Sequence, residues 1–311
     1  MGASSLEKQY KEHLSNYKDW KRNKDVHALV YPQNFGKRMS IDETSLHKGE
    51  VYTIITNKDA KTQEGSLAAI IKGTKNSVVS RALEKVPFEI RMNVQEITAD
   101  LANSMDWICR TNFICARQVA DRFHVQALVY EAVQEIRILE RRKAIDEDNQ
   151  QEKSARKQGM PWRPFRYENG DTKKQLLARG RYLLFKPRGK WTPSQTERAT
   201  ILFREHPELE LAYSLCMRFR DTFENKNLSK AEAENLLKNW AQHVKDSKLD
   251  QLISASETIM NNLGKVTNYF CNRATNASAE SFNAKLKGFR ALLRGVRDTS
   301  FFLYRVEQLF A

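Results

Sequence analysis

The stretch of sequence that decides the fold is residues 39–71, MSIDETSLHKGEVYTIITNKDAKTQEGSLAAII. It holds three short runs rich in β-branched and apolar residues, and brief polar turns at Gly49 and Gly65 separate them. Runs of strand length joined by such turns are typical of hairpins, so we expect an antiparallel meander. The three expected strands cover residues 39–42, 51–56 and 66–71.

Beyond this stretch the pattern changes to alternating helices and strands. One helix is expected at 77–85, where Pro87 stops it, and a second at 104–113. Further strands are expected at 94–99 and 116–120. Strands that are reached over a helix run parallel to their neighbours. The resulting order, βββαβαβ, is that of an RNase H-like domain, so the predicted fold class is α/β with a mixed sheet.

After residue 121 the strand signal disappears and the remaining sequence is helical in pattern. A helix is expected at 123–142 and a polar loop at 143–171. Further helices are expected at 172–185, 193–205, 209–223, 229–245 and 247–271. We therefore expect a helical lead-in at 1–38, a first part of the RNase H-like core at 39–127, a large all-helical insertion at 128–272 that contains a basic loop at 143–190, and C-terminal core helices at 273–311.

Positive charge is concentrated in two segments of the chain. The 311 residues include 52 Lys and Arg against 38 Asp and Glu, so the net charge is +14. Residues 153–190 carry 12 − 2 = +10 and residues 281–297 carry +5, which accounts for the whole excess. Nucleic acid is the first candidate partner, an anionic membrane surface is the second, and solvated faces are the alternative to both. The residues expected to contact the phosphates of double-stranded DNA are Arg163, Arg166, Lys173, Lys174, Arg179, Arg181, Lys186, Arg188 and Lys190 in the first segment, and Lys285, Lys287, Arg290, Arg294 and Arg297 in the second.

Cysteine usage and hydropathy exclude several other classes of protein. The cysteines form no C-x-x-C pair, so we expect neither a zinc site nor a disulfide scaffold, and we expect a cytoplasmic protein. No window approaches the ~20 consecutive apolar residues of a membrane span. The first residues also lack the apolar segment of a secretory leader.

Three acidic residues stand at positions where catalytic carboxylates converge. Asp42 ends the first expected strand, Asp100 follows the fourth, and Glu280 lies in the first turn of a late helix at about 276–293. Strand ends that face a helix N-terminus form a crevice. Three carboxylates there suit Mg²⁺, with Mn²⁺ as a substitute, and two ions ~4 Å apart hold both reacting oxygens of a phosphodiester. The structural alternatives are a turn acid for Asp42, a helix cap for Asp100 and a dipole-complementing role for Glu280.

The late helix is amphipathic. A helical wheel gathers its apolar side chains on one face, which we expect to pack on the core. The opposite side carries one carboxylate, then an amide and three cations, so we expect this side to face the crevice and the DNA. The apolar residues are Phe282, Leu286, Phe289 and Leu293, and the polar ones are Glu280, Asn283, Lys287, Arg290 and Arg294.

Three separated motifs, in order, resemble one known family. They are SIDETSL at 40–46, DRFHV at 121–125, and TNASAESFNAK at 275–285 with RGVR at 294–297. Together they are similar to the ISL-three family of DDE transposases of bacterial insertion sequences. The resemblance implies an RNase H-like catalytic domain interrupted by a helical insertion, and metal-dependent cleavage and strand transfer of DNA. It places the first acid at Asp42 and the third at Glu280.

The second acid has two candidates. Asp121 lies in the strongest motif, but in RNase H-like sheets the fourth strand lies beside the first, which favours Asp100. The unit Asp121-x-x-His124 also resembles a C/D-x-x-H signature of related transposases that lies apart from the metal-binding acid. For His124, a satisfied core histidine is the alternative to a catalytic role.

The resemblance also implies partners. We expect double-stranded DNA at element ends and at the target, a homodimer or higher oligomer on DNA, and action at the bacterial nucleoid. Longer relatives carry an N-terminal zinc-binding and helix-turn-helix region, whereas about 38 residues precede the first expected strand here. A separate end-recognition protein is therefore a candidate partner. A domesticated DNA-binding protein and an RNase H-like nuclease without strand transfer are the alternative functions.

Overall fold

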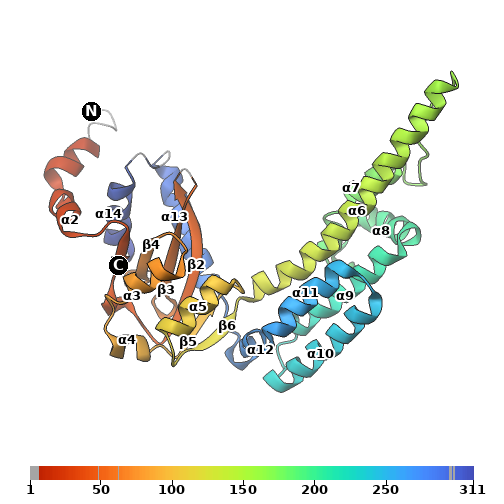
Figure 1. Cartoon of the computed structure of the whole chain (residues 1–311). Coiled ribbons are helices and arrows are strands. Elements are labelled where there is room, and N and C mark those ends of the chain that lie inside the picture. The colour runs from red at the N-terminus through yellow and green to blue at the C-terminus, as the bar shows by residue number, and fades with distance from the viewer. Residues whose placement is uncertain (1–6, 48, 62, 294–295, 297) are drawn as a thin grey trace. The chain divides into compact units, whose positions relative to one another are not determined.

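The computed structural model describes residues 7–47, 49–61, 63–293, 296 and 298–311. The chain divides into two compact units, each visible in Figure 1. The first unit contains the chain up to Arg122 and again from Cys271 to the C-terminus, and the second contains the intervening segment from Phe123 to Phe270.

The first unit is built on a six-stranded mixed sheet. The strand order is β1-β4-β3-β2-β5-β6, in which β1, β4, β3 and β2 pair antiparallel, while β2, β5 and β6 pair parallel. An antiparallel meander continued by two parallel strands confirms the predicted RNase H-like fold. The strands are β1 (Ala28–Val30), β2 (Arg38–His47), β3 (Glu50–Asn57), β4 (Leu67–Lys72), β5 (Glu96–Ala99) and β6 (Arg117–Ala120).

Apolar side chains of this sheet form a core on each of its faces. Successive strand residues point to opposite faces, and the neighbours Ile54 and Ile55 accordingly belong to different cores. Ile55 packs in the core that includes α3 (Asn76–Leu83) and α5 (Asn103–Asn112). Ile54 packs in the core that includes helices from both ends of the chain, namely α2 (Tyr17–Asn23), α13 (Ala277–Leu292) and α14 (Thr299–Phe310).

The expected lead-in at 1–38 is wrong as a separate part, because its described residues belong to the sheet and its cover. Strand β1 pairs with β4 at the edge of the sheet. The indole of Trp20 and the hydroxyl of Tyr31 each donate a hydrogen bond to Glu307 at 2.7 Å. A three-residue strand is too short to show an alternating pattern, which explains why the sequence did not reveal β1. Short helical segments also lie at Tyr10–Leu14, Pro32–Asn34, Lys58–Ala60 and, as α4, at Phe88–Met92.

The second unit is helical among its described residues. Its longer helices pack through aromatic side chains such as Phe219 and Trp240, whose ring centroids are 4.6 Å apart. No helix in the described part of the chain is long and apolar enough to cross a membrane. The helices are α6 (Arg122–Lys157), α7 (Lys173–Arg179), α8 (Pro193–Glu205), α9 (Pro207–Glu224), α10 (Lys230–Ser247), α11 (Asp250–Asn261) and α12 (Leu263–Asn272), with short 3₁₀ turns at Leu183–Phe185 and Arg188–Lys190.

The predicted basic loop at 143–190 is wrong. Helix α6 continues to Lys157, and α7 and both 3₁₀ turns lie in the rest of the segment. Residues 143–157 are mostly Glu, Gln, Lys, Arg and Ala, which have high helix propensity, and they include neither Gly nor Pro. Most of this stretch is exposed, so the apolar periodicity that marks a packed helix is missing although the helix is present.

Candidate functional site

The register of β2 and β5 brings two candidate acids to the same part of the sheet. Ser40 of β2 is paired with Thr98 of β5 in parallel register. Asp42 lies two residues beyond Ser40, and Asp100 lies two residues beyond Thr98. Because side chains alternate along a strand, the carboxylate of Asp42 points to the same face as Ser40, while Asp100 follows the last residue of β5. The expectation that Asp42 ends its strand is wrong, because β2 continues to His47.

Asp42 is held by the late helix. Its Oδ1 accepts a hydrogen bond from the backbone N–H of Glu43 at 2.8 Å, and its Oδ2 accepts one from Nδ2 of Asn283 at 2.6 Å. The second bond brings α13 against β2 at this acid, as the two elements appear in Figure 1. Asn283 is only 7% exposed, so its expected position on the side of the helix opposite the packed face is wrong. The turn-acid alternative for Asp42 is also wrong, because the residue lies within a strand.

Glu43 is a neighbour of the site that sequence reasoning missed. Its side chain reaches the surface, yet partial desolvation and then the negative charges of Asp100 and Asp42 raise its pKa above the ordinary value. The two aspartates are therefore close enough to Glu43 to act on its ionisation. Nothing in the sequence pattern pointed to Glu43, because strand alternation turns its side chain to the face opposite Asp42.

Asp100 lies in the turn after β5. Its Oδ1 accepts a hydrogen bond from the backbone N–H of Ala102 at 3.0 Å. Ala102 is itself the N-cap residue of α5, and no side chain caps that helix. Asp100 therefore shapes the turn before α5 and does not cap the helix directly. Its side chain is half-buried, so part of it stays open to solvent.

Asp121 and His124 flank the start of α6. The backbone N–H of Asp121 donates to the carbonyl oxygen of Ala99 at 2.8 Å, so Asp121, one residue beyond β6, is still hydrogen-bonded to the end of β5. Asp100 thus lies between Asp42 and Asp121 across the sheet. The side chain of Asp121 is completely buried. His124 is exposed in the first turn of α6, so the core-histidine alternative is wrong.

Glu280 is exposed in the first turn of α13. It precedes Asn283 by three residues, and side chains at that spacing lie on neighbouring parts of one helix face. Among the residues that the structure describes, no three or more His, Cys, Asp or Glu side chains form a group spaced to hold a metal ion. Asp42 and Asp100 nevertheless carry hard carboxylate oxygens, the type of donor that Mg²⁺ and Mn²⁺ prefer.

The cations of the second predicted DNA-binding segment continue along α13. Lys285 and Lys287 are exposed, and Nζ of Lys285 lies 6.0 Å from the ring centroid of Phe310. Arg290 is half-buried. Arg294 and Arg297 lie outside the described residues.

The first predicted DNA-binding segment contains cations of two kinds. Four of them form ion pairs: Lys173 with Glu147, Lys174 with Asp148, Arg179 with Asp171, and Arg188 with Glu210. Asp171 is completely buried and also pairs with Arg198 at 2.9 Å, so Arg179 belongs partly to a structural cluster. Arg163, Arg181 and Lys190 are exposed and make no ion pair with any residue that the structure describes. Arg166 and Lys186 complete the set, and Arg166 donates a hydrogen bond to the carbonyl oxygen of Gly170 at 2.7 Å.

Comparison with known proteins gives one result. A family model described as a transposase, for the ISL-three group of the DDE class, matches residues 39–306. This range begins within β2, ends within α14 and includes every candidate acid. Neither the curated proteins nor the solved structures give a match.

Proposed function

Because its family model matches most of the sequence, the chain belongs to the ISL-three family of DDE transposases, and we propose that it cuts DNA at the ends of an insertion sequence and joins them to a target. Membership makes it a protein of DNA transposition that acts on DNA with a divalent metal ion. The finer proposal is phosphodiester hydrolysis followed by transesterification, with two Mg²⁺ ions or Mn²⁺ in their place and no zinc.

The acids proposed to hold the ions are Asp42, Asp100 and Glu280. The observation that carries the pairing of the two aspartates is the parallel register of β2 and β5, in which Ser40 pairs with Thr98, two residues before each acid. When bound, the ions supply positive charge that stabilises the developing charge on the phosphodiester oxygens. The protein contributes orientation, since Asn283 fixes one carboxylate oxygen of Asp42 by a hydrogen bond from α13, the helix that also carries Glu280.

Asp100 is favoured over Asp121 for two reasons. It follows the strand that pairs directly with β2, whereas Asp121 follows the next strand out. The side chain of Asp121 is also completely buried, while a ligand shared with a DNA phosphate has to reach solvent. We propose that Asp121 and His124 act outside metal binding, at the start of α6.

DNA is proposed to contact cations of each unit. On α13, Lys287 and Arg290 follow Glu280 by seven and ten residues, spacings that keep them near the same side of the helix. In the second unit, the exposed cations without ion pairs are the proposed phosphate contacts. A homodimer or higher oligomer, a separate end-recognition protein and action at the bacterial nucleoid complete the proposal.

A joining assay distinguishes this function from its alternatives. Purified protein is incubated with a plasmid that carries the flanking ends of its element, Mn²⁺ and a target plasmid, and both nicking and joined products are quantified. We expect both products from the parent protein, and a loss of about a thousandfold for Asp42→Asn, which removes several kcal/mol of charge stabilisation. Asp106→Asn, at a carboxylate on α5 that pairs with Arg110, is the matched control and should retain activity. Nicking without joining would indicate a nuclease, and DNA binding without nicking a domesticated protein.

A further inference from the structure

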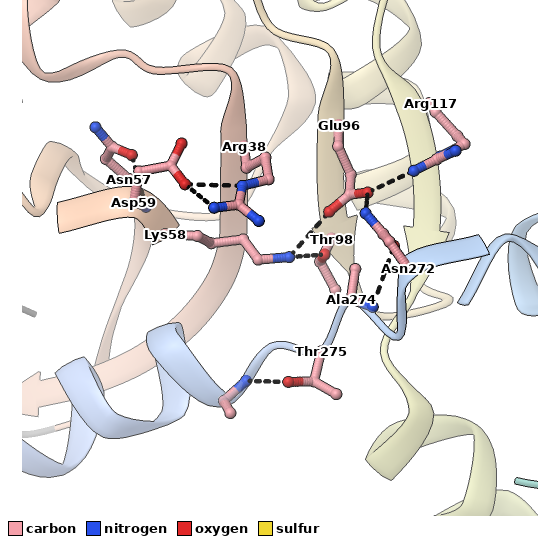
Figure 2. A network of polar contacts seen from close by, with 11 residues as sticks. Arg38, Asn57, Lys58, Asp59, Glu96, Thr98, Arg117, Asn272, Ala274 and Thr275 are labelled. Atoms are coloured by element: carbon pink, nitrogen blue, oxygen red, sulfur yellow. Dashed lines mark hydrogen bonds and ion pairs between the residues drawn. The ribbon is translucent and has the colours of Figure 1, made fainter. Parts of the chain in front are cut away.

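A buried charge network lies beside the candidate site, on the sheet face that carries Ser40 and Thr98. Figure 2 shows its centre, the carboxylate of Glu96 in β5. Glu96 is 3% exposed and receives hydrogen bonds from three different elements. Its donors are Lys58 Nζ at 3.2 Å, Arg117 in β6 at 2.8 Å, and Asn272 Nδ2 at 2.6 Å.

The network keeps Glu96 ionised. Burial alone raises the pKa of a carboxyl group, but the hydrogen bonds from Arg117 and Asn272 and the charge of Lys58 together lower the pKa of Glu96 below its ordinary value. Lys58 also donates to the hydroxyl of buried Thr98 at 2.9 Å, so its ammonium group is fixed from two sides. Glu96 is thus a rigid, charged acceptor.

Asn272 connects this acceptor to the segment that leads into α13. Its Nδ2 donates to Glu96, and its Oδ1 accepts from the backbone N–H of Ala274 at 3.3 Å. The hydroxyl of Thr275, three residues after Asn272, accepts a hydrogen bond from the N–H of Ala277, the first residue of α13, at 3.4 Å. Figure 2 shows the hydrogen bond from Asn272 to Glu96 and, farther along the segment that leads into the helix, the contact at Thr275.

We propose that Glu96 and Asn272 are positioning residues that set where α13 begins and thereby hold Glu280 and Asn283 beside β2. Neither Glu96 nor Asn272 takes part in the proposed reaction. Helix α13 begins only five residues after Asn272. Loss or displacement of the hydrogen bond between Asn272 and Glu96 therefore moves the start of α13 directly. The effect of this positioning on catalysis rests on the proposed function, whereas its effect on the start of α13 does not.

Two substitutions separate the hydrogen bond from Asn272 to Glu96 from the turn contact between Asn272 and the N–H of Ala274. Asn272→Asp keeps an oxygen for the N–H of Ala274 but replaces the donor to Glu96 with a negative charge. Asn272→Ala removes both contacts without adding charge. The matched control is Asn225→Asp, because Asn225 also ends a helix and accepts a backbone N–H two residues on, at 3.0 Å, but lies in the second unit. The readouts are amide hydrogen exchange at 277–283 in metal-free protein, Mn²⁺ affinity without DNA, and the thermal unfolding midpoint.

The expected result is faster exchange at 277–283 in both Asn272 variants, by about tenfold, the factor for loss of one hydrogen bond to a charged group. Mn²⁺ affinity should fall by a similar factor, and the unfolding midpoint should fall more in Asn272→Asp, which places a second carboxylate against buried Glu96, than in Asn272→Ala, while the Asn225→Asp control stays close to the parent protein. Parent-like exchange in Asn272→Ala would overturn the proposal. Parent-like exchange in Asn272→Asp alone would also overturn it, because the contact to the N–H of Ala274 would then hold the helix start without the hydrogen bond to Glu96. Exchange is measured without metal or DNA, so a parent protein that fails to nick DNA refutes the proposed function and leaves this test intact.

Discussion

The exposed and the paired cations of the second unit should contribute differently to DNA binding. A triple variant at Arg163, Arg181 and Lys190 removes three exposed positive charges that make no ion pair with the described residues. Each phosphate contact contributes about 0.9 to the slope of log K against log salt, so the slope should flatten by up to about 2.7. A second triple variant, at Lys173, Lys174 and Arg188, removes the same charge from ion pairs and should flatten the slope far less.

The assay is fluorescence anisotropy of an unrelated DNA duplex, titrated with protein at several NaCl concentrations. All six positions are replaced with Gln, so the two variants have equal net charge and differ only in which cations are lost. Equal slopes for the two variants would refute the reasoning, because binding would then depend on net charge alone. A slope unchanged from the parent in the first variant would exclude these residues as phosphate contacts.

Two further predictions concern the stability of the second unit. Asp171→Ala should lower the free energy of unfolding by about 3–5 kcal/mol in urea titrations, because it leaves Arg198 partly buried without its partner; a loss below about 1 kcal/mol would show that the cluster is dispensable. Burial lowers the pKa of His206 although Glu140 lies 3.1 Å away, so the unfolded chain binds a proton more readily than the folded one. Stability should therefore be complete above pH 6.5 and fall as the pH drops below it, and His206→Gln should lose this component in thermal melts between about pH 7 and 5; an identical pH dependence in the variant would contradict it.

Much of the sheet could be predicted because its strands carry local signals. The apolar runs of β3 and β4 are nearly continuous and lie between glycine turns, and the parallel strands are separated by helices of recognisable pattern. The extent of β2 was harder, since the polar residues after Asp42 are typical of a turn. They remain in a strand because β3 pairs with them as far as His47.

The extent of α6 could not be predicted from periodicity. Beyond about residue 142 this helix is mostly solvated, so its sequence shows propensity without an apolar stripe. The ion pairs of Lys173 and Lys174 with acids of α6 could not be predicted either, because the partners are 26 residues apart in the sequence. A count of charges by segment therefore did not show that four of the predicted DNA-binding cations have acidic partners.

The candidate acids could be chosen from sequence, but their environment could not. Asp100 directly follows β5, a position that sequence patterns reveal, whereas Asp42 lies in the middle of β2. The hydrogen bond from Asn283 to Asp42 joins residues 241 positions apart, and the tie between Glu96 and Asn272 spans 176. Contacts of that range depend on the completed packing of α13 and β5 in the first unit.

The assignment of Asp100 as the second metal-binding acid is tested most directly by Mn²⁺ binding to two isosteric variants, Asp100→Asn and Asp121→Asn. Binding is measured by electron paramagnetic resonance of free Mn²⁺ in the absence of DNA, with Asp106→Asn as the control. We expect Asp100→Asn to weaken Mn²⁺ binding at least about tenfold, since one charged oxygen ligand is lost, while Asp121→Asn binds as the parent protein does. Normal binding by Asp100→Asn together with loss of binding by Asp121→Asn would contradict this assignment.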